Sequence, residues 1–218
     1  KFGDTVIVPA YGWRATVNAP KFVGLKIIYC DIDNTGNVDL HQLEDLILKH
    51  NPAAVLIVHN FGTIVDISKI STVCKTNNVK IIEDAAPSFV MNEDYDYILG
   101  YHSDMVCFSF DFTKSPGCLG AGGALATNDE ELYNKIKIIC SHTSSEYGIG
   151  TKSYLDTVSA SVLNTDIKLI EQNKYRQRRV DIATYYINNL PYNFLSGKNY
   201  IFHRFIILTD RNEKQTVI

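Results

Sequence analysis

The strongest constraint on the fold of this chain is its regular alternation of short apolar runs with longer amphipathic ones. The apolar runs are rich in β-branched side chains and nearly continuous, as is typical of strands covered on both faces. They span residues 6–9, 26–30, 54–58, 80–83, 105–110 and 123–127. Helical periodicity marks residues 13–22, 39–49, 66–77 and 129–140 between and after them. Strand and helix repeated in this order predict an α/β fold, with a mostly parallel or mixed sheet sandwiched between helices.

The pattern changes after Ser141, which indicates a second structural unit. Residues 142–150 have the composition of a loop, 156–190 that of a long interrupted helix, and 200–208 that of a further strand. We therefore expect a large domain over residues 1–142. Residues 143–218 should form a loop, a linker helix and the beginning of a small α+β domain. Both ends of the chain look cut, so we expect a fragment of a longer protein.

Composition excludes several classes of protein. With 218 residues, 45% of them hydrophobic and 21% charged, the chain is typical of a soluble globular protein. A net charge of −3 and the lack of a basic cluster interleaved with aromatic residues argue against nucleic-acid binding. No apolar stretch approaches the roughly 20 residues that cross a bilayer. The five cysteines include no C-x-x-C pair, which favours a reducing, cytoplasmic compartment, and we expect no metal site.

Polar residues that could take part in catalysis or bind a cofactor lie at the ends of apolar runs. Lys114 follows one run and leads into the glycine-rich segment 117–123, and Asp84 ends another run before two alanines. A lysine amine can hold an aldehyde cofactor as a Schiff base, and a carboxylate can keep a pyridine nitrogen protonated. Together they indicate a pyridoxal phosphate site. His59 also ends a run, but a histidine there is more often a structural hydrogen-bonding group than a catalyst.

Several motifs, taken in order along the chain, resemble those of the DegT-type sugar aminotransferases, which are fold-type-I pyridoxal phosphate enzymes. The longest of them are Gly3-Asp4-Thr5-Val6-Ile7-Val8-Pro9, Val58-His59-Asn60-Phe61-Gly62, Glu83-Asp84-Ala85-Ala86 and Phe108-Ser109-Phe110 with the following Lys114. Residues 31–39, 120–124 and 127–132 also follow the family's order. Each motif alone is weak, but the set spans nearly the whole chain.

The resemblance implies a role for each site residue. Lys114 would be the catalytic lysine that carries the cofactor and shuttles a proton, and Asp84 would bind the pyridine nitrogen. Ala86 would leave room for one face of the ring, and Trp13 would stack on the other face. Ser109 would bind the cofactor phosphate, whose main donors in this family lie on a helix upstream of residue 1.

The chain also departs from the family's pattern. Pro87 stands where the family has glutamine or histidine, and Ala121 replaces a common acidic residue. Lys152 and Tyr154 stand where an asparagine and an arginine are usual. That asparagine reaches the phosphate of the neighbouring subunit in the family, so Lys152 is expected to serve as a cofactor-binding point charge.

The resemblance implies an aminotransferase that moves an amino group from glutamate to a nucleotide-linked keto-sugar, as a homodimer. One alternative is a pyridoxal phosphate-dependent sugar dehydratase. Family members with that activity replace the lysine by histidine, so Lys114 favours amino transfer. A degenerate module without catalytic activity is a second alternative, given the departures. An NAD-binding fold is disfavoured because no G-x-G-x-x-G follows the first apolar run.

Overall fold

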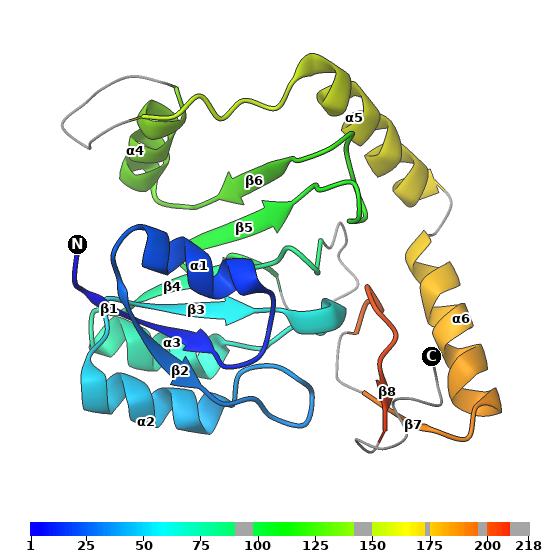
Figure 1. The fold of residues 1–218 in the computed structure, drawn as a ribbon, viewed down its shortest axis with the longest axis horizontal. Coiled ribbons are helices and arrows are strands. Elements are labelled where there is room, and N and C mark those ends of the chain that lie inside the picture. Colours follow the sequence, from blue (N-terminus) through cyan, green and yellow to red (C-terminus); the bar gives the residue numbers. More distant parts are fainter. Residues whose placement is uncertain (90–97, 142–149, 173–174, 196–199, 210–218) are drawn as a thin grey trace.

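The computed structural model describes residues 1–89, 98–141, 150–172, 175–195 and 200–209 (Figure 1). A sheet of six strands in the order β2-β1-β3-β4-β5-β6 forms its centre. The strands are β1 (Thr5–Pro9), β2 (Lys26–Cys30), β3 (Ala54–Val58), β4 (Lys80–Asp84), β5 (Met105–Ser109) and β6 (Gly123–Ala126). All neighbouring pairs are parallel except β5 and β6, which are antiparallel. The predicted α/β fold with a mixed, mostly parallel sheet is confirmed.

Helices cover both faces of this sheet. They are α1 (Arg14–Phe22), α2 (Leu40–His50), α3 (Ser68–Thr76), α4 (Glu130–Cys140), α5 (Thr157–Gln172) and α6 (Tyr175–Asn189). In Figure 1, α1 lies in front of the sheet while α2 and α3 lie together on the other side. Right-handed crossovers require this arrangement, because the chain reverses its direction across the sheet at β2. No helix among the described residues is long and apolar enough to cross a membrane.

The main core lies between the sheet and the pair α2 and α3. Ile7, Val55 and Ile57 of the strands pack there against Ile47 of α2 and Ile70 of α3, all at most 2% exposed. Fully burying an aliphatic side chain of this size contributes about 1.5–3 kcal/mol. This packed layer supports the strands whose carboxyl ends carry the predicted site residues.

The expected long interrupted helix is present as α5 and α6, and residues 142–149 of the expected loop at 142–150 lie outside the described residues. Two strands differ from the expectation. The residues of β6 are all exposed, so this strand is not covered on both faces. The expected strand 200–208 is wrong for most of its length. Only β8 (Ile207–Leu208) is a strand, and it pairs with β7 (Asn193–Phe194).

Residues 200–204 instead bend against the short 3-10 helix η1 (Asn60–Gly62) that follows β3, as the orange segment beside it in Figure 1 shows. The backbone N–H of Ile201 donates to the Gly62 carbonyl at 2.8 Å, and that of Arg204 donates to the Phe61 carbonyl at 3.2 Å. Gly62 has φ +92°, and an added Cβ would lie 2.9 Å from the backbone nitrogen of His203. The close approach therefore requires glycine at this position.

Candidate active site

The carboxyl ends of β3, β4 and β5 bring the predicted site residues to one edge of the sheet. The register pairs Asp84, the last residue of β4, with Val58 of β3 and Cys107 of β5. The Asp84 side chain is half-buried, and its Oδ1 accepts the Ala86 N–H at 3.0 Å. The Thr16 hydroxyl lies 3.5 Å from Oδ2. This contact is long, so Oδ2 can accept a shorter hydrogen bond from a ligand.

Lys114 lies in the turn that follows β5, and its side chain is half-buried. Its backbone N–H donates to the Asp111 carbonyl at 2.8 Å. Burial lowers the pKa of the Lys114 amine; the charge of Asp84 opposes this shift, and the charge of Arg204 adds to it. Lys114 and Asp84 thus lie within electrostatic range of each other. A lowered pKa increases the fraction of neutral, nucleophilic amine at a given pH.

The other residues expected to hold the cofactor ring also lie at this edge. Trp13 precedes α1 with its side chain 81% exposed, and its carbonyl accepts the Thr16 N–H at 3.1 Å. Since the Thr16 hydroxyl contacts Asp84, the indole belongs to the same end of the sheet. Ala86 follows Asp84 by two residues and is bonded to it through its N–H. Their contacts with a ring stay predictions.

The two residues expected to bind phosphate lie in different parts of the fold. Ser109 ends β5, half-buried, and its hydroxyl lies 3.4 Å from the backbone nitrogen of Asp111, so it points into the turn that carries Lys114. Lys152 is exposed and forms an isolated bridge with Ser141, just after α4. Figure 1 shows the segment between α4 and α5 apart from the ends of β4 and β5. The bridge places Lys152 beside the end of α4, and its expected role across subunits stays a prediction.

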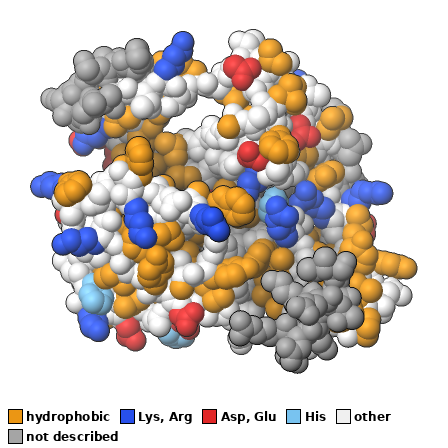
Figure 2. Space-filling view, in the orientation of Figure 1, with side chains coloured by type: hydrophobic (Ala, Val, Ile, Leu, Met, Phe, Trp, Pro, Cys, Tyr) orange, Lys and Arg blue, Asp and Glu red, His pale blue; other side chains and the backbone are white. Residues whose placement is uncertain are grey.

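A group of cationic side chains near Lys114 was missed in the sequence. His203 is half-buried, and burial lowers its pKa to about 4, assisted by the charges of Lys114, Arg179 and Arg204. Arg179 of α6 reaches this segment, because its Nη1 lies 3.4 Å from the Phe202 carbonyl oxygen. Figure 2 shows lysine or arginine side chains beside a histidine near the middle of this face. The only signal in the sequence was the pair His203-Arg204 inside an apolar run.

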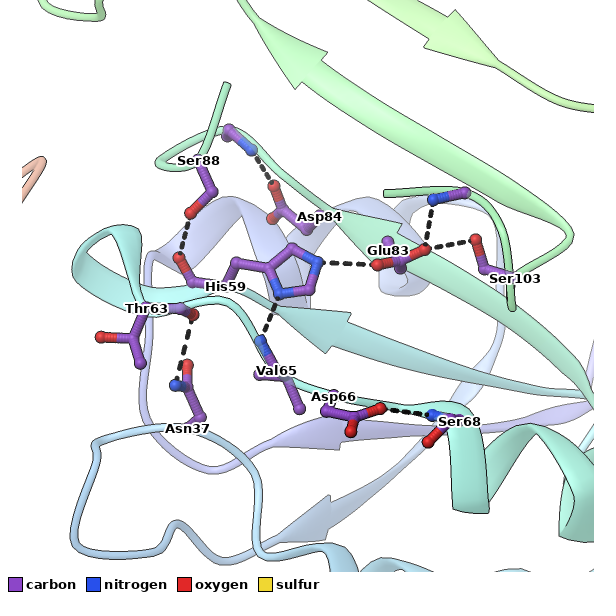
Figure 3. Close-up of polar contacts among 12 residues, drawn as sticks. Asn37, His59, Thr63, Val65, Asp66, Ser68, Glu83, Asp84, Ser88 and Ser103 are labelled. Carbon is purple, nitrogen blue, oxygen red and sulfur yellow. Dashed lines mark hydrogen bonds and ion pairs between the residues drawn. The ribbon is translucent and has the colours of Figure 1, made fainter. Parts of the chain in front are cut away.

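Beneath the site lies a buried polar network, drawn in Figure 3. His59 and Glu83 have fully buried side chains, and His59 Nε2 lies 2.8 Å from Glu83 Oε2. Glu83 Oε1 accepts the Gly100 N–H at 2.9 Å and the Ser103 hydroxyl at 2.5 Å. Burial by itself raises the pKa of Glu83, but the hydrogen bonds from His59, Ser103 and Gly100 outweigh burial and lower it. These hydrogen bonds favour the ionised form of the Glu83 carboxylate in the core.

The chemistry of these donors fits the ring and aldehyde ends of pyridoxal phosphate. Lys114 supplies a half-buried primary amine with a lowered pKa. Asp84 supplies a carboxylate oxygen that can accept a strong hydrogen bond from a pyridinium N–H. The 81% exposed indole of Trp13 offers an aromatic face at the same edge. An electron-withdrawing aldehyde cofactor needs these groups and no metal ligand.

Comparison with known proteins gives the same result. The family model described as the DegT/DnrJ/EryC1/StrS aminotransferase family matches residues 1–217. The chain is 32% identical to UDP-2-acetamido-2-deoxy-3-oxo-D-glucuronate aminotransferase of Pseudomonas aeruginosa, over 82% of this chain and 50% of that protein. It is 30% identical to dTDP-3-amino-3,6-dideoxy-alpha-D-galactopyranose transaminase of Aneurinibacillus thermoaerophilus, over 97% of this chain and 60% of that protein.

A solved structure shows the same fold over the whole chain. NtdA from Bacillus subtilis with bound cofactor PMP superimposes with a TM-score of 0.86 and 27% identity, over 100% of this chain and 52% of that chain. This chain thus spans between half and three fifths of the length of the two curated relatives.

Proposed function

Because this chain belongs to the DegT/DnrJ/EryC1/StrS aminotransferase family, we propose that it acts in a pyridoxal phosphate-dependent sugar aminotransferase. The reaction moves an amino group from glutamate to the keto carbon of a nucleotide-linked sugar. The observation that carries the proposal is geometric: β4 and β5 are parallel neighbours, so Asp84 at the end of β4 and Lys114 in the turn after β5 lie at the same edge of the sheet. Relatives named as transaminases of nucleotide-linked amino sugars support the substrate class.

Each residue at the strand ends has a task in this reaction. Pyridoxal phosphate, when bound, withdraws electrons from the substrate carbon. The Lys114 Nζ, with its lowered pKa, can attack the cofactor aldehyde and later accept and return a proton. Asp84 Oδ2 would keep the ring nitrogen protonated, Trp13 would cover one ring face, and Ala86 would leave the other face free of side-chain bulk. Ser109 would donate a hydrogen bond to the phosphate.

The cationic group supports an anionic substrate. Arg179 and Arg204 carry full charges at neutral pH, and neither guanidinium forms an ion pair with a residue in the described part of the chain. Both act on His203, and Arg204 acts on Lys114 as well. Guanidinium groups near His203, one of which also acts on the Lys114 amine, suit the diphosphate of a nucleotide-linked sugar or the carboxylates of glutamate.

A homodimer and a cytoplasmic location belong to the same proposal. Lys152 forms a bridge with Ser141 just after α4 and is not part of the strand ends that carry Asp84 and Lys114, which supports a role at the cofactor phosphate of a neighbouring subunit. The five cysteines are all unpaired, and burial raises the pKa of Cys30 to about 12 and that of Cys74 to about 11. Such thiols pack as small apolar groups, which supports a reducing compartment.

Reconstitution with pyridoxal phosphate tests the proposal. We expect a visible absorption band that glutamate bleaches, and we expect borohydride to fix the cofactor to the peptide containing Lys114. Lys114→Ala should abolish both effects. Lys80→Ala is the matched control, because Lys80 is an exposed lysine at the opposite end of β4. A protein that stays colourless would refute the proposal and favour a module without catalysis. A band with sugar deoxygenation but no amino transfer would favour a dehydratase.

A further inference from the structure

We propose that the buried pair His59 and Glu83 is a positioning device that aims the Asp84 carboxylate at the cofactor ring nitrogen. The proposal rests on the function proposed above and assigns a task to two residues that do not touch the reacting atoms. It follows from three features of the network in Figure 3: the direction of its hydrogen bonds, its backbone links to Asp84, and its location under the strand ends.

The hydrogen bonds of His59 allow only one direction. The backbone N–H of Val65 donates to Nδ1 at 3.1 Å, so that nitrogen carries a lone pair and no proton. The ring proton of the neutral imidazole is then on Nε2, from which it is donated to Glu83 Oε2 at 2.8 Å. Glu83 accepts at both oxygens, from His59 on one and from Gly100 and Ser103 on the other. Each of these four contacts therefore has a fixed donor and a fixed acceptor.

The same two residues hold the backbone around Asp84. The His59 N–H donates to the Asp84 carbonyl at 3.1 Å, and the buried Ser88 hydroxyl donates to the His59 carbonyl at 2.9 Å. Glu83 immediately precedes Asp84 on β4, so the two side chains point to opposite faces of the sheet. Because Glu83 is held inside the core, the side chain of Asp84 is directed to the opposite face of the sheet.

Stability alone does not account for a charged pair at this place. Desolvating a carboxylate costs several kcal/mol, and well-packed apolar side chains of similar volume are often equally or more stable. Apolar packing, however, has no preferred direction, whereas hydrogen bonds define angles as well as distances. The pair is also placed where direction matters, because its links run to the strand end that carries Asp84 and to the segment before β5, which leads to Lys114.

Glu83→Gln is a sharp test because it preserves volume but replaces one acceptor by a donor. If the new NH₂ group faces His59, two donors meet at Nε2, and a change of tautomer would only move the conflict to the Val65 N–H. If it faces the other way, it meets the Gly100 N–H. The readout is the ¹⁵N resonance of the ring nitrogen in labelled pyridoxal phosphate bound to the protein, together with the dissociation constant of the cofactor. The variant should shift the resonance toward the deprotonated form and weaken cofactor binding about tenfold, which corresponds to about 1.4 kcal/mol.

Two further variants separate positioning from stability. Ile70→Val shortens a side chain that is 2% exposed in the same core, at a cost of about 0.5–1.5 kcal/mol, and should leave the ring-nitrogen signal unchanged. Ser103→Ala removes one donor to Glu83 in the segment before β5 and should shift the resonance in the same direction as Glu83→Gln, by less. If Glu83→Gln does not fold, the ring-nitrogen resonance of Ser103→Ala alone tests the positioning role.

The outcomes distinguish this inference from the proposed function. A wild-type protein that binds no pyridoxal phosphate would refute the proposed function, and this inference with it. The positioning role alone would be overturned if the ring nitrogen is protonated in the wild type and the variants of Glu83 and Ser103 give the same signal. The positioning role would also be overturned if Ile70→Val shifts the resonance as much as these variants do at an equal loss of stability.

Discussion

Gly62→Ala should detach residues 200–204 from η1 and move Arg204 away from Lys114. The docking includes two backbone hydrogen bonds, from Ile201 at 2.8 Å and from Arg204 at 3.2 Å, which together contribute about 2 kcal/mol. A Cβ at Gly62 would lie 2.6 Å from Ile201 Cγ1 and 2.9 Å from the backbone nitrogen of His203. A rotamer change cannot relieve the second overlap. Overpacking of this kind costs about 1–3 kcal/mol, which is comparable to the contribution of these two hydrogen bonds.

Gly3→Ala is the matched control for this variant. Gly3 has φ +84°, close to the +92° of Gly62, but an added Cβ at Gly3 would have no atom within 4 Å. Both variants therefore carry the strain of a left-handed alanine, about 1–2 kcal/mol, and only Gly62→Ala adds the overlap. The difference of about 1–3 kcal/mol corresponds to a loss of amide-exchange protection of about 5- to 150-fold at Ile201 and Arg204. Equal protection at Ile201 in the two variants would refute the reasoning.

Two further predictions concern charge and pH. Arg204→Gln removes a positive neighbour that lowers the pKa of Lys114, so the pKa of Lys114 should rise. The pH at which pyridoxal phosphate reacts with the amine should then move upward. An unchanged pH profile would show that the guanidinium does not act on Lys114. The pKa of His203 is about 4 in the folded protein and about 6.5 when unfolded, so its contribution to stability is complete above pH 6.5 and is lost as pH falls toward 4. His203→Gln should flatten the fall of the unfolding free energy over this range in urea titrations, and a wild-type slope in the variant would contradict the assignment.

The elements of the sheet could be predicted from the sequence because local chemistry determines them. Runs of β-branched residues gave β2 and β3 with their observed bounds, and Asp39 marked the start of α2, where its side chain accepts the N–H groups of His41 and Gln42. The segment 200–208 failed because its bend depends on a distant partner. Its apolar composition suits a strand, but contacts with Gly62 hold Phe202 at φ +51°.

Part of the site could likewise be predicted from the sequence. Lys114 and Asp84 follow from the rule that the carboxyl ends of parallel strands meet at one edge. The group formed by Arg179, His203 and Arg204 depends on the docking of residues far along the chain, which no local pattern encodes. The partner of His59 could not be foreseen either, because it depends on how β3 and β4 align. The roles of Trp13, Ala86, Ser109 and Lys152 stay predictions.

The adjacent carboxylates of β4 have a consequence for how the sheet assembles. The native alignment pairs Ile57 with Glu83 and Val58 with Asp84. A slip of β4 by one residue would reverse every side chain, placing Asp84 in the core and Glu83 at the surface. The shorter Asp84 side chain would reach His59 poorly, and an unpaired buried carboxylate costs several kcal/mol. Misaligned sheets are thus penalised most at the strand whose alignment the chemistry needs, so folding itself selects against molecules with a displaced Asp84.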